Sequence, residues 1–166
     1  MITTHSYTND PLLADAPHKD FWCTRAASAS NTPTTTRAAK SIGGISRCLE
    51  GKINGMALRI PRSDGSKAVM GMKSTKNVIN DHVDRKSKDN QDKEKEDSNG
   101  VMTFTAQPLG YADTVVWPHS YVDDGQSPRI FGDKIEAIKV PSYYDNERSF
   151  ARRFVDPMKF VRSKVK

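Results

Sequence analysis

Four histidines and two cysteines are the side chains of this sequence best suited to chemistry, and they are scattered along the chain. His82 stands between two aspartates in the run 81–84, where a carboxylate could orient the imidazole as a general base. His119 precedes Asp123 and Asp124, a pattern that predicts a turn whose carboxylates could hold a cation. The first cluster adjoins a purely charged run and lacks the preorganisation that catalysis needs. We therefore expect no catalytic residue and keep a small enzyme using His82 or His119 as an alternative only.

A zinc site is the other chemistry that these side chains could supply. Cys23, Cys48, His82 and His119 offer suitable donor atoms, but their separations match no compact ligand spacing. The sequence also lacks the motifs GxxxxGK[ST], GxGxxG, HExxH, CxxC and GxSxG. We expect no metal, no cofactor and no small-molecule substrate.

The last twenty residues carry the strongest charge signal, a net charge of +5 within a chain whose formal net charge is +6. Phe150 and Phe154 lie four apart and predict one apolar helix face, with guanidinium groups on the other face. Such a helix could bind nucleic acid or another acidic surface, or could present a solvated face. The alternative is a membrane-surface protein, in which Phe150, Phe154 and Phe160 enter the interface while the Arg and Lys side chains meet anionic headgroups. The candidate binding residues are Arg148, Arg152, Arg153, Lys159, Arg162 and Lys164.

Two further surfaces are candidates for binding. Arg59, Arg62, Lys67 and Lys73 form a secondary basic patch without aromatic residues, which could hold phosphates but offers no stacking platform for bases. The dipeptide Phe21-Trp22 could anchor the chain in a partner's pocket or could pack on the core of the protein.

The helices and strands that must position these residues need apolar side chains for a core, and such side chains are unevenly distributed along the sequence. Leu, Ile, Val and Phe together make up 31 of the 166 residues, a fraction near the level at which disorder begins. Ten of the thirteen aromatic residues follow residue 100. Because buried aromatic side chains dominate core energetics, we expect the best core in the last two-fifths of the chain.

Four segments follow from this distribution. Residues 1–42 predict a flexible Ser/Thr-rich arm, and residues 43–83 a thin β-meander with turns at Asn54-Gly55 and at residues 62–66. Residues 84–100 predict a charged linker. Residues 101–166 predict a β-rich core followed by two short helices, capped at Asp145 or Asn146 and interrupted at Pro157.

The fold class expected is α+β: a small antiparallel β-meander core, a basic amphipathic C-terminal helix pair and a long disordered or extended N-terminal arm. The function expected is non-enzymatic: a structural, RNA-binding subunit that docks with protein subunits in a larger assembly and contacts RNA or DNA, or another acidic surface, through its basic C-terminal helix. The layout is similar to that of viral coat and matrix proteins. Two reduced cysteines and the lack of a secretory signal predict a cytoplasmic or nuclear protein, not a secreted one, with organelle import held open.

Overall fold

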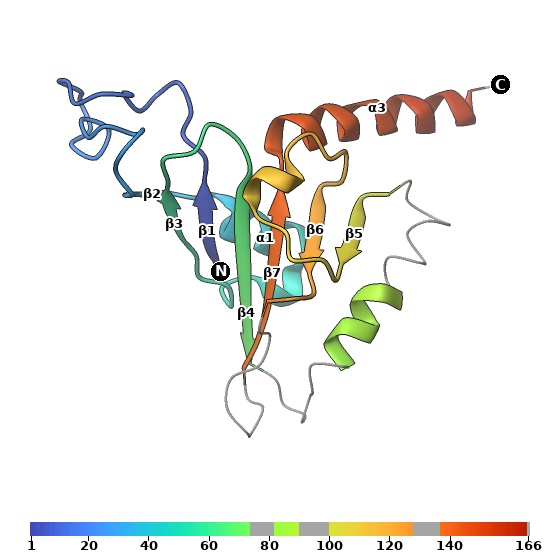
Figure 1. Ribbon diagram of the computed structural model, residues 1–166. Coiled ribbons are helices and arrows are strands. Elements are labelled where there is room, and N and C mark those ends of the chain that lie inside the picture. The colour runs from blue at the N-terminus through green and yellow to red at the C-terminus, as the bar shows by residue number, and fades with distance from the viewer. Residues whose placement is uncertain (74–81, 90–99, 128–136, 166) are drawn as a thin grey trace. The chain divides into compact units, whose positions relative to one another are not determined.

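The computed structural model describes residues 1–73, 82–89, 100–127 and 137–165 of the chain (Figure 1). The chain divides into two compact units, residues 1–71 and residues 72–166, and each unit is described by itself. The division of the chain into four segments, which the sequence predicted, stays a prediction.

The first unit is built on a mixed sheet with the strand order β2-β3-β1-β4. Strands β1 and β3 are parallel, whereas β4 pairs with β1 and β2 pairs with β3 in the antiparallel sense. The strands are β1 (Ile2–His5), β2 (Thr32–Thr34), β3 (Met56–Arg59) and β4 (Ser66–Lys73).

Two strands of the predicted meander form, β3 and β4, one on each side of the predicted turn at residues 62–66, but they do not form a hairpin. Strand β1 lies between them and pairs with both. The Asn54-Gly55 pair precedes β3 and does not join two strands. Gly55 is required there by a close approach, since a Cβ at this position would lie 2.9 Å from the Cβ of Ala39.

Small side chains fill the interior of the first unit. Helix α1 (Ala38–Ile45) buries Ala39 and Gly43, and a short 3-10 helix (Arg47–Leu49) follows it. Small side chains allow close packing of the backbones but bury little apolar area each. The other buried residues of this unit include Thr3, Ala27, Thr32, Ala57 and Ser66.

The second unit contains the strand order β7-β6-β5, in which β5 and β6 are parallel and β6 and β7 antiparallel. Tyr111 and Tyr143 meet edge to face in its interior, with ring centroids 5.3 Å apart. Its elements are a helical segment at 82–89, β5 (Met102–Thr105), a 3-10 helix (Tyr111–Thr114), β6 (Tyr121–Asp124), β7 (Ala137–Tyr144) and helix α3 (Asn146–Lys164).

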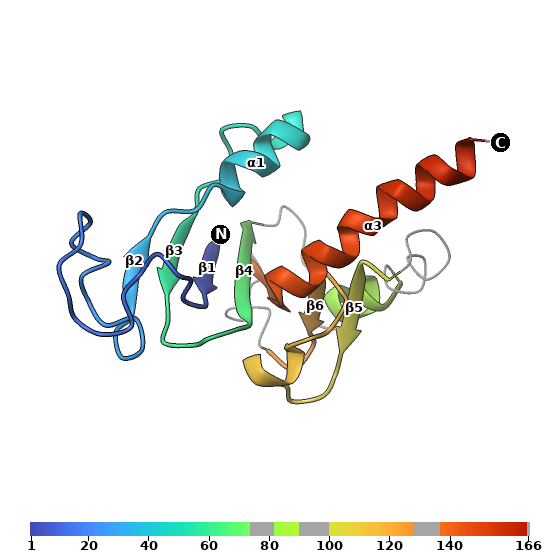
Figure 2. The same cartoon turned by 90° about the horizontal axis from the view of Figure 1, so that it is seen from above.

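The predicted helix pair is wrong, because α3 is one continuous helix with Pro157 in its interior (Figure 2). Proline removes one backbone donor, and the hydrogen-bonded turns on both sides carry the helix across the gap. The prediction that Asp145 caps this helix is confirmed, since its side chain accepts a hydrogen bond from the backbone N–H of Arg148 at 2.8 Å.

The predicted fold class is also wrong, since both units contain parallel strand pairs and neither is an antiparallel meander. The expected N-terminal arm begins instead with β1, which is hydrogen-bonded on both sides. Parallel pairing joins segments that are distant in sequence, so neighbouring residues carry no signal for it.

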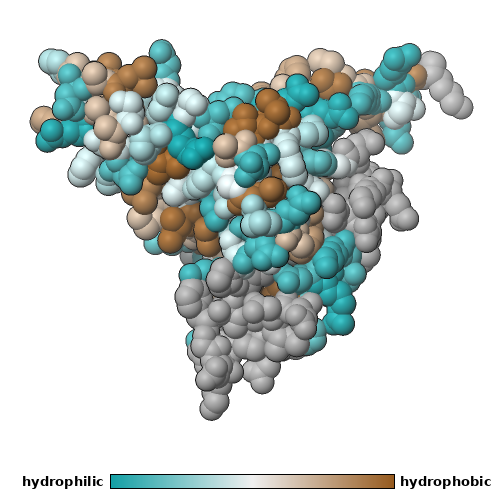
Figure 3. Space-filling model, viewed as in Figure 1, coloured by the Kyte–Doolittle hydropathy of each residue, from teal (hydrophilic) through white to brown (hydrophobic). Residues whose placement is uncertain are grey.

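The expected aromatic core is only partly formed. The side chains of Phe150, Phe154 and Phe160 are 67%, 61% and 64% exposed on α3, and Figure 3 shows apolar side chains at the surface over this helix. Among the described residues, no helix combines the length and the apolar character needed to cross a bilayer.

Candidate functional site

The candidate site lies where the parallel strands β1 and β3 end. His5 is the last residue of β1 and Arg59 the last of β3, and the register pairs them directly. On its other side Arg59 is paired with Thr32 of β2. Residues paired in this way project from the same face of a sheet, so an imidazole, a guanidinium and a hydroxyl share one edge of the first unit.

The imidazole of His5 is held in its neutral form. Burial lowers the pKa of His5 below its ordinary 6.5, and the positive charge of Arg59 lowers it further. Both causes disfavour the imidazolium ion, because a desolvated cation next to a second cation is costly. His5 is therefore neutral near pH 7 and can accept a proton.

Arg59 is oriented by the segment that follows β1. Its Nη1 donates to the Thr8 hydroxyl at 3.0 Å and to the carbonyl oxygen of Ser6 at 3.5 Å. A guanidinium fork beside a hydroxyl is a donor set that suits a phosphate group.

A hollow of about 250 Å³ opens beside this guanidinium. Threonines from β2 and the residue after it contribute hydroxyl groups to its wall, and Trp22 contributes an aromatic side chain. The guanidinium and the threonine hydroxyl groups are hydrogen-bond donors that a small anionic molecule could use. The lining residues of the hollow are Asp20, Trp22, Cys23, Thr32, Pro33, Thr34, Thr35 and Arg59.

The thiol on this wall is not an activated nucleophile. Burial raises the pKa of Cys23, and the carboxylates of Asp20 and Asp10 raise it further. A reactive cysteine needs the opposite shift, because the thiolate is the nucleophile. The other cysteine, Cys48, is an exposed free thiol whose sulfur lies 3.2 Å from the Ser46 hydroxyl.

The structure places all six candidate binding residues of the C-terminal segment on α3 of the second unit. Five of their side chains are exposed. The Nε of Arg153 lies 3.1 Å from the Oδ2 of Asp156, and the ammonium group of Lys164 lies 5.4 Å from the centre of the Phe160 ring. Two of the basic side chains of α3 therefore contact other side chains of the same helix.

The secondary basic patch is divided by the fold. Arg59 belongs to the site at the strand ends, Arg62 lies in the turn after β3, and Lys67 and Lys73 lie on β4. Only Arg59 is brought to the hollow.

The expected partner anchor is accessible. Phe21 and Trp22 are 88% and 56% exposed, and Trp22 also borders the hollow. That Phe21-Trp22 anchors a partner stays a prediction.

The two histidines singled out from the sequence belong to the second unit and do not contribute to this site. His82 is exposed at the start of the segment 82–89, and Asp81 lies outside the described residues. The Nδ1 of His119 donates to the carbonyl oxygen of Gly100 at 2.7 Å. The expected turn at Asp123-Asp124 is the buried end of β6, where the two side chains are 0% and 4% exposed.

Sequence reasoning missed His5 and Thr8. The β-branched residues Ile2, Thr3 and Thr4 favour a strand that leads to His5, and this was the available signal. The partner residue Arg59 could not be assigned to His5 without the parallel register.

The first unit is thus a mixed sheet that pairs an imidazole with a guanidinium at the ends of two parallel strands. Residues 1–146 match the family "Glyceraldehyde 3-phosphate dehydrogenase, C-terminal domain". Because this match covers most of the 166 residues, the chain belongs to that family.

Curated relatives carry the same name. The chain is 36% identical over 164 residues to glyceraldehyde-3-phosphate dehydrogenase from Geobacillus stearothermophilus, covering 99% of this chain and 48% of the relative. It is 35% identical over 170 residues to glyceraldehyde-3-phosphate dehydrogenase 2 from Bacillus subtilis, covering 100% and 47%. A chloroplastic relative from Arabidopsis thaliana is 35% identical over 156 residues, covering 94% and 38%. The chain thus spans about half the length of these relatives.

These findings correct the function expected from the sequence. The family is one of metabolic enzymes, so the interpretations as a non-enzymatic structural subunit, as a nucleic-acid-binding or viral-like protein, and as a membrane-surface protein are wrong. The expectation of no small-molecule substrate is wrong as well, since the relatives are named for one. The physical reason for the error is that the basic charge on α3 was taken as the functional signal, whereas His5 of the candidate site lies in residues 1–42, which were predicted to be a flexible arm.

Proposed function

We propose that this chain supplies the substrate-handling part of a dehydrogenase that acts on a phosphorylated aldehyde of the glyceraldehyde 3-phosphate type. The observation that carries the proposal is the pairing of His5 with Arg59 at the ends of two parallel strands. One residue is a proton acceptor and the other an anion-binding group, and such a substrate requires both.

Arg59 is proposed to bind the phosphate group. Its guanidinium already donates to the Thr8 hydroxyl at 3.0 Å, and hydroxyl groups of residues 32, 34 and 35 line the adjacent hollow. A phosphate placed there would receive charge-assisted hydrogen bonds from Arg59 and neutral ones from the threonines. Charge-assisted bonds are about twice as strong, so Arg59 should dominate the affinity.

His5 is proposed to accept a proton. Oxidation of the hydrated aldehyde, in which water has added to the carbonyl, removes a hydride from carbon and a proton from oxygen. The lowered pKa keeps His5 in the neutral form that can take up this proton. A general base of this kind typically contributes about 10²–10⁴-fold to the rate.

The hydride requires an acceptor, which the name of the relatives implies. The Gly-rich fingerprint GxGxxG, which holds the pyrophosphate of a dinucleotide, does not occur in this sequence. The residues of this chain therefore do not fit a dinucleotide site of that kind, and no step is assigned to the acceptor here.

A location in the cytoplasm is part of the proposal. Both cysteines are free thiols, which suits a reducing compartment. The chloroplastic relative from Arabidopsis thaliana keeps an organelle location as the alternative.

The experiment is a binding titration of the purified chain with glyceraldehyde 3-phosphate, followed by backbone amide NMR shifts. We expect the shifts to concentrate on the amides near Thr8, residues 32–35 and Arg59. Arg59→Ala should weaken binding by at least about tenfold, as expected for a lost charge-assisted hydrogen bond of ~1.5–3 kcal/mol. Lys52→Ala is the matched control, because Lys52 is an exposed cation of the same unit outside the hollow. Equal affinities of the Arg59 variant and the parent chain would refute the phosphate assignment.

A further inference from the structure

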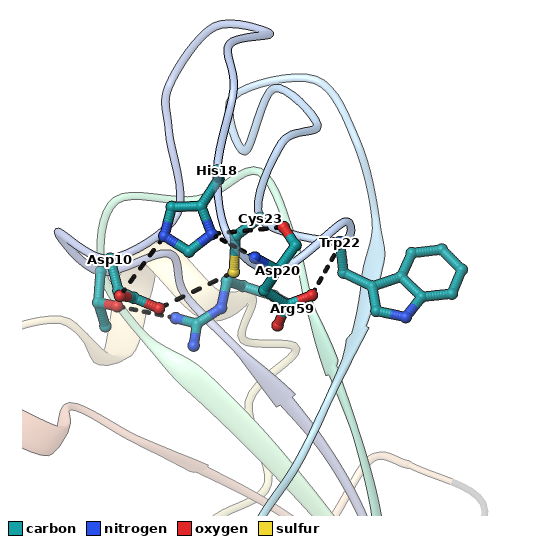
Figure 4. A network of polar contacts seen from close by, with 7 residues as sticks. Asp10, His18, Asp20, Trp22, Cys23 and Arg59 are labelled. Carbon is teal, nitrogen blue, oxygen red and sulfur yellow. Dashed lines mark hydrogen bonds and ion pairs between the residues drawn. The ribbon is translucent and has the colours of Figure 1, made fainter.

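We propose that the hollow beside Arg59 binds phosphate monoesters that carry a flat, uncharged ring. The phosphate lies on the Arg59 guanidinium and the ring lies against the indole of Trp22, two groups that line the same hollow. Figure 4 shows this indole extending away from the side chains of His18 and Cys23. The inference rests on the proposed phosphate-binding role of Arg59 and adds a second class of ligand to it.

The guanidinium of Arg59 is anchored through one nitrogen and keeps further donors. Its Nη1 donates to the hydroxyl of Thr8 at 3.0 Å and to the carbonyl oxygen of Ser6 at 3.5 Å. Within the part of the chain that the structure describes, Nη2 and Nε make no hydrogen bond. Guanidinium groups bind phosphate through two parallel N–H donors, and Nε with Nη2 forms such a fork. A phosphate can therefore bind without displacing the contacts that orient Arg59.

The indole of Trp22 is a wall of the hollow that no other ring covers. Trp22 is 56% exposed, and among the described residues it stacks on no aromatic ring and on no cation. An accessible indole face attracts flat rings, because offset stacking adds to the burial of apolar area. A flat ring on the ligand is therefore expected at this wall.

A hydrogen-bonded turn holds Trp22 at the hollow. The N–H of Trp22 donates to Oδ1 of Asp20 at 3.0 Å, and its carbonyl oxygen accepts the N–H of Arg25 at 3.4 Å. The N–H of Cys23 donates to the carbonyl oxygen of Asp20 at 3.1 Å. Because the backbone is bonded on both sides of Trp22, ligand binding requires little ordering of the chain here.

The charges around the hollow favour one anionic group and an uncharged ring. Arg59 is the only cation among the described residues that line it. Asp20 also lines the hollow, and its carboxylate would repel a second anionic group on the ligand. The thiol of Cys23 is neutral, since burial raises its pKa and the carboxylates of Asp20 and Asp10 raise it further. At about 250 Å³ the hollow is smaller than the ~300–1,000 Å³ of drug-sized sites, which favours a small ligand.

A ligand of this class would compete with the proposed substrate, because both place a phosphate on Arg59. The strand register puts His5 and Thr32 on opposite sides of Arg59. Thr32 and Trp22 line the hollow, whereas His5 does not. The ring therefore lies on the side away from the proposed general base, and the ester is bound without being converted.

The test is an NMR titration of the purified chain with phenyl phosphate, cyclohexyl phosphate and methyl phosphate. Phenyl phosphate should bind about two- to tenfold more tightly than cyclohexyl phosphate, because stacking adds to the burial of a ring of similar size. Trp22→Ala should remove this preference and leave the affinity for methyl phosphate unchanged, and Trp22→Phe should retain it. Phe21→Ala is the matched control, since Phe21 is 88% exposed and does not line the hollow.

Equal affinities of the parent chain for the phenyl and cyclohexyl esters would overturn the inference without any variant. A preference that survives Trp22→Ala, or one that is lost in Phe21→Ala, would overturn it as well. Arg59→Ala with methyl phosphate tests the proposed phosphate site separately. An unchanged affinity, or a parent chain that binds none of the three esters, contradicts that site and this inference together. Binding that depends on Arg59 but shows no ring preference contradicts this inference alone.

Discussion

His5 and Arg59 are register partners at the ends of β1 and β3, although most of the first unit separates them in sequence. Parallel pairing is the cause, because it brings the carboxyl ends of two strands to one edge of a sheet. Burial lowers the pKa of this imidazole, and the cation that the pairing places next to it lowers the pKa further. The backbone register thus sets the position of the proposed general base and adds to the effect of burial on its protonation state.

The first prediction concerns the pKa of His5. Arg59→Ala should raise this pKa toward its ordinary 6.5, because it removes the neighbouring positive charge and leaves burial as the remaining cause. The measurement is a pH titration of the imidazole resonances by NMR. Lys52→Ala serves as the control and should leave the curve in place. An unchanged His5 curve in the Arg59 variant would show that burial alone sets the pKa.

The second prediction concerns stability against pH. The folded-state pKa of His5 lies below its ordinary 6.5, so the unfolded chain binds more protons in the interval between these two values. The free energy of unfolding should therefore fall as the pH decreases from 6.5 through the lowered pKa, and should be unaffected by His5 above 6.5. Urea midpoints of the parent chain and of His5→Gln across this range provide the measurement. The variant should show the smaller loss, and parallel curves would contradict the assignment.

The strands at Met56 and Lys67 were predictable because alternation and turn residues are local signals. The strand at Ile2 was not, since its Ser/Thr-rich surroundings indicated disorder and its two partners lie far along the chain. Neighbouring residues show that a segment can form a strand, but not which strand it will join.

The candidate site shows the same division. Arg59 was identified as a candidate phosphate ligand from its charge, whereas the proposed role of His5 depends on its strand partner. The basic residues after Asn146 were given too much weight, because their net charge can be counted directly in the sequence. The strand pairing that distinguishes one histidine from the others cannot be read there.

The third prediction concerns Asp145, which is 3% exposed and satisfies two backbone donors. Its Oδ1 accepts the N–H of Arg148 and its Oδ2 accepts the N–H of Val116, both at 2.8 Å. Asp145→Ala leaves both donors without this acceptor and should cost about 2–4 kcal/mol of stability. Asp145→Asn keeps one acceptor oxygen and should cost roughly half as much. The urea denaturation midpoints measure both, and an alanine variant as stable as the parent chain would exclude the capping role.

The fourth prediction concerns Val116, a β-branched residue in the left-handed region with φ of 64°. This conformation costs a non-glycine residue about 1–2 kcal/mol, and the side chain, which is 67% exposed, recovers little of that by packing. Val116→Gly removes the strain but adds a loss of backbone entropy of ~0.5–1 kcal/mol, so its net effect should be a gain of up to about 1.5 kcal/mol. Its neighbour Val115, with φ of −62°, is the matched control, and Val115→Gly should destabilise the protein by roughly 0.5–1 kcal/mol.

Thermal denaturation of the two variants distinguishes them, because only relief of strain at Val116 makes the two substitutions change the stability in opposite directions. Equal losses in both would show that Val116 stores no strain.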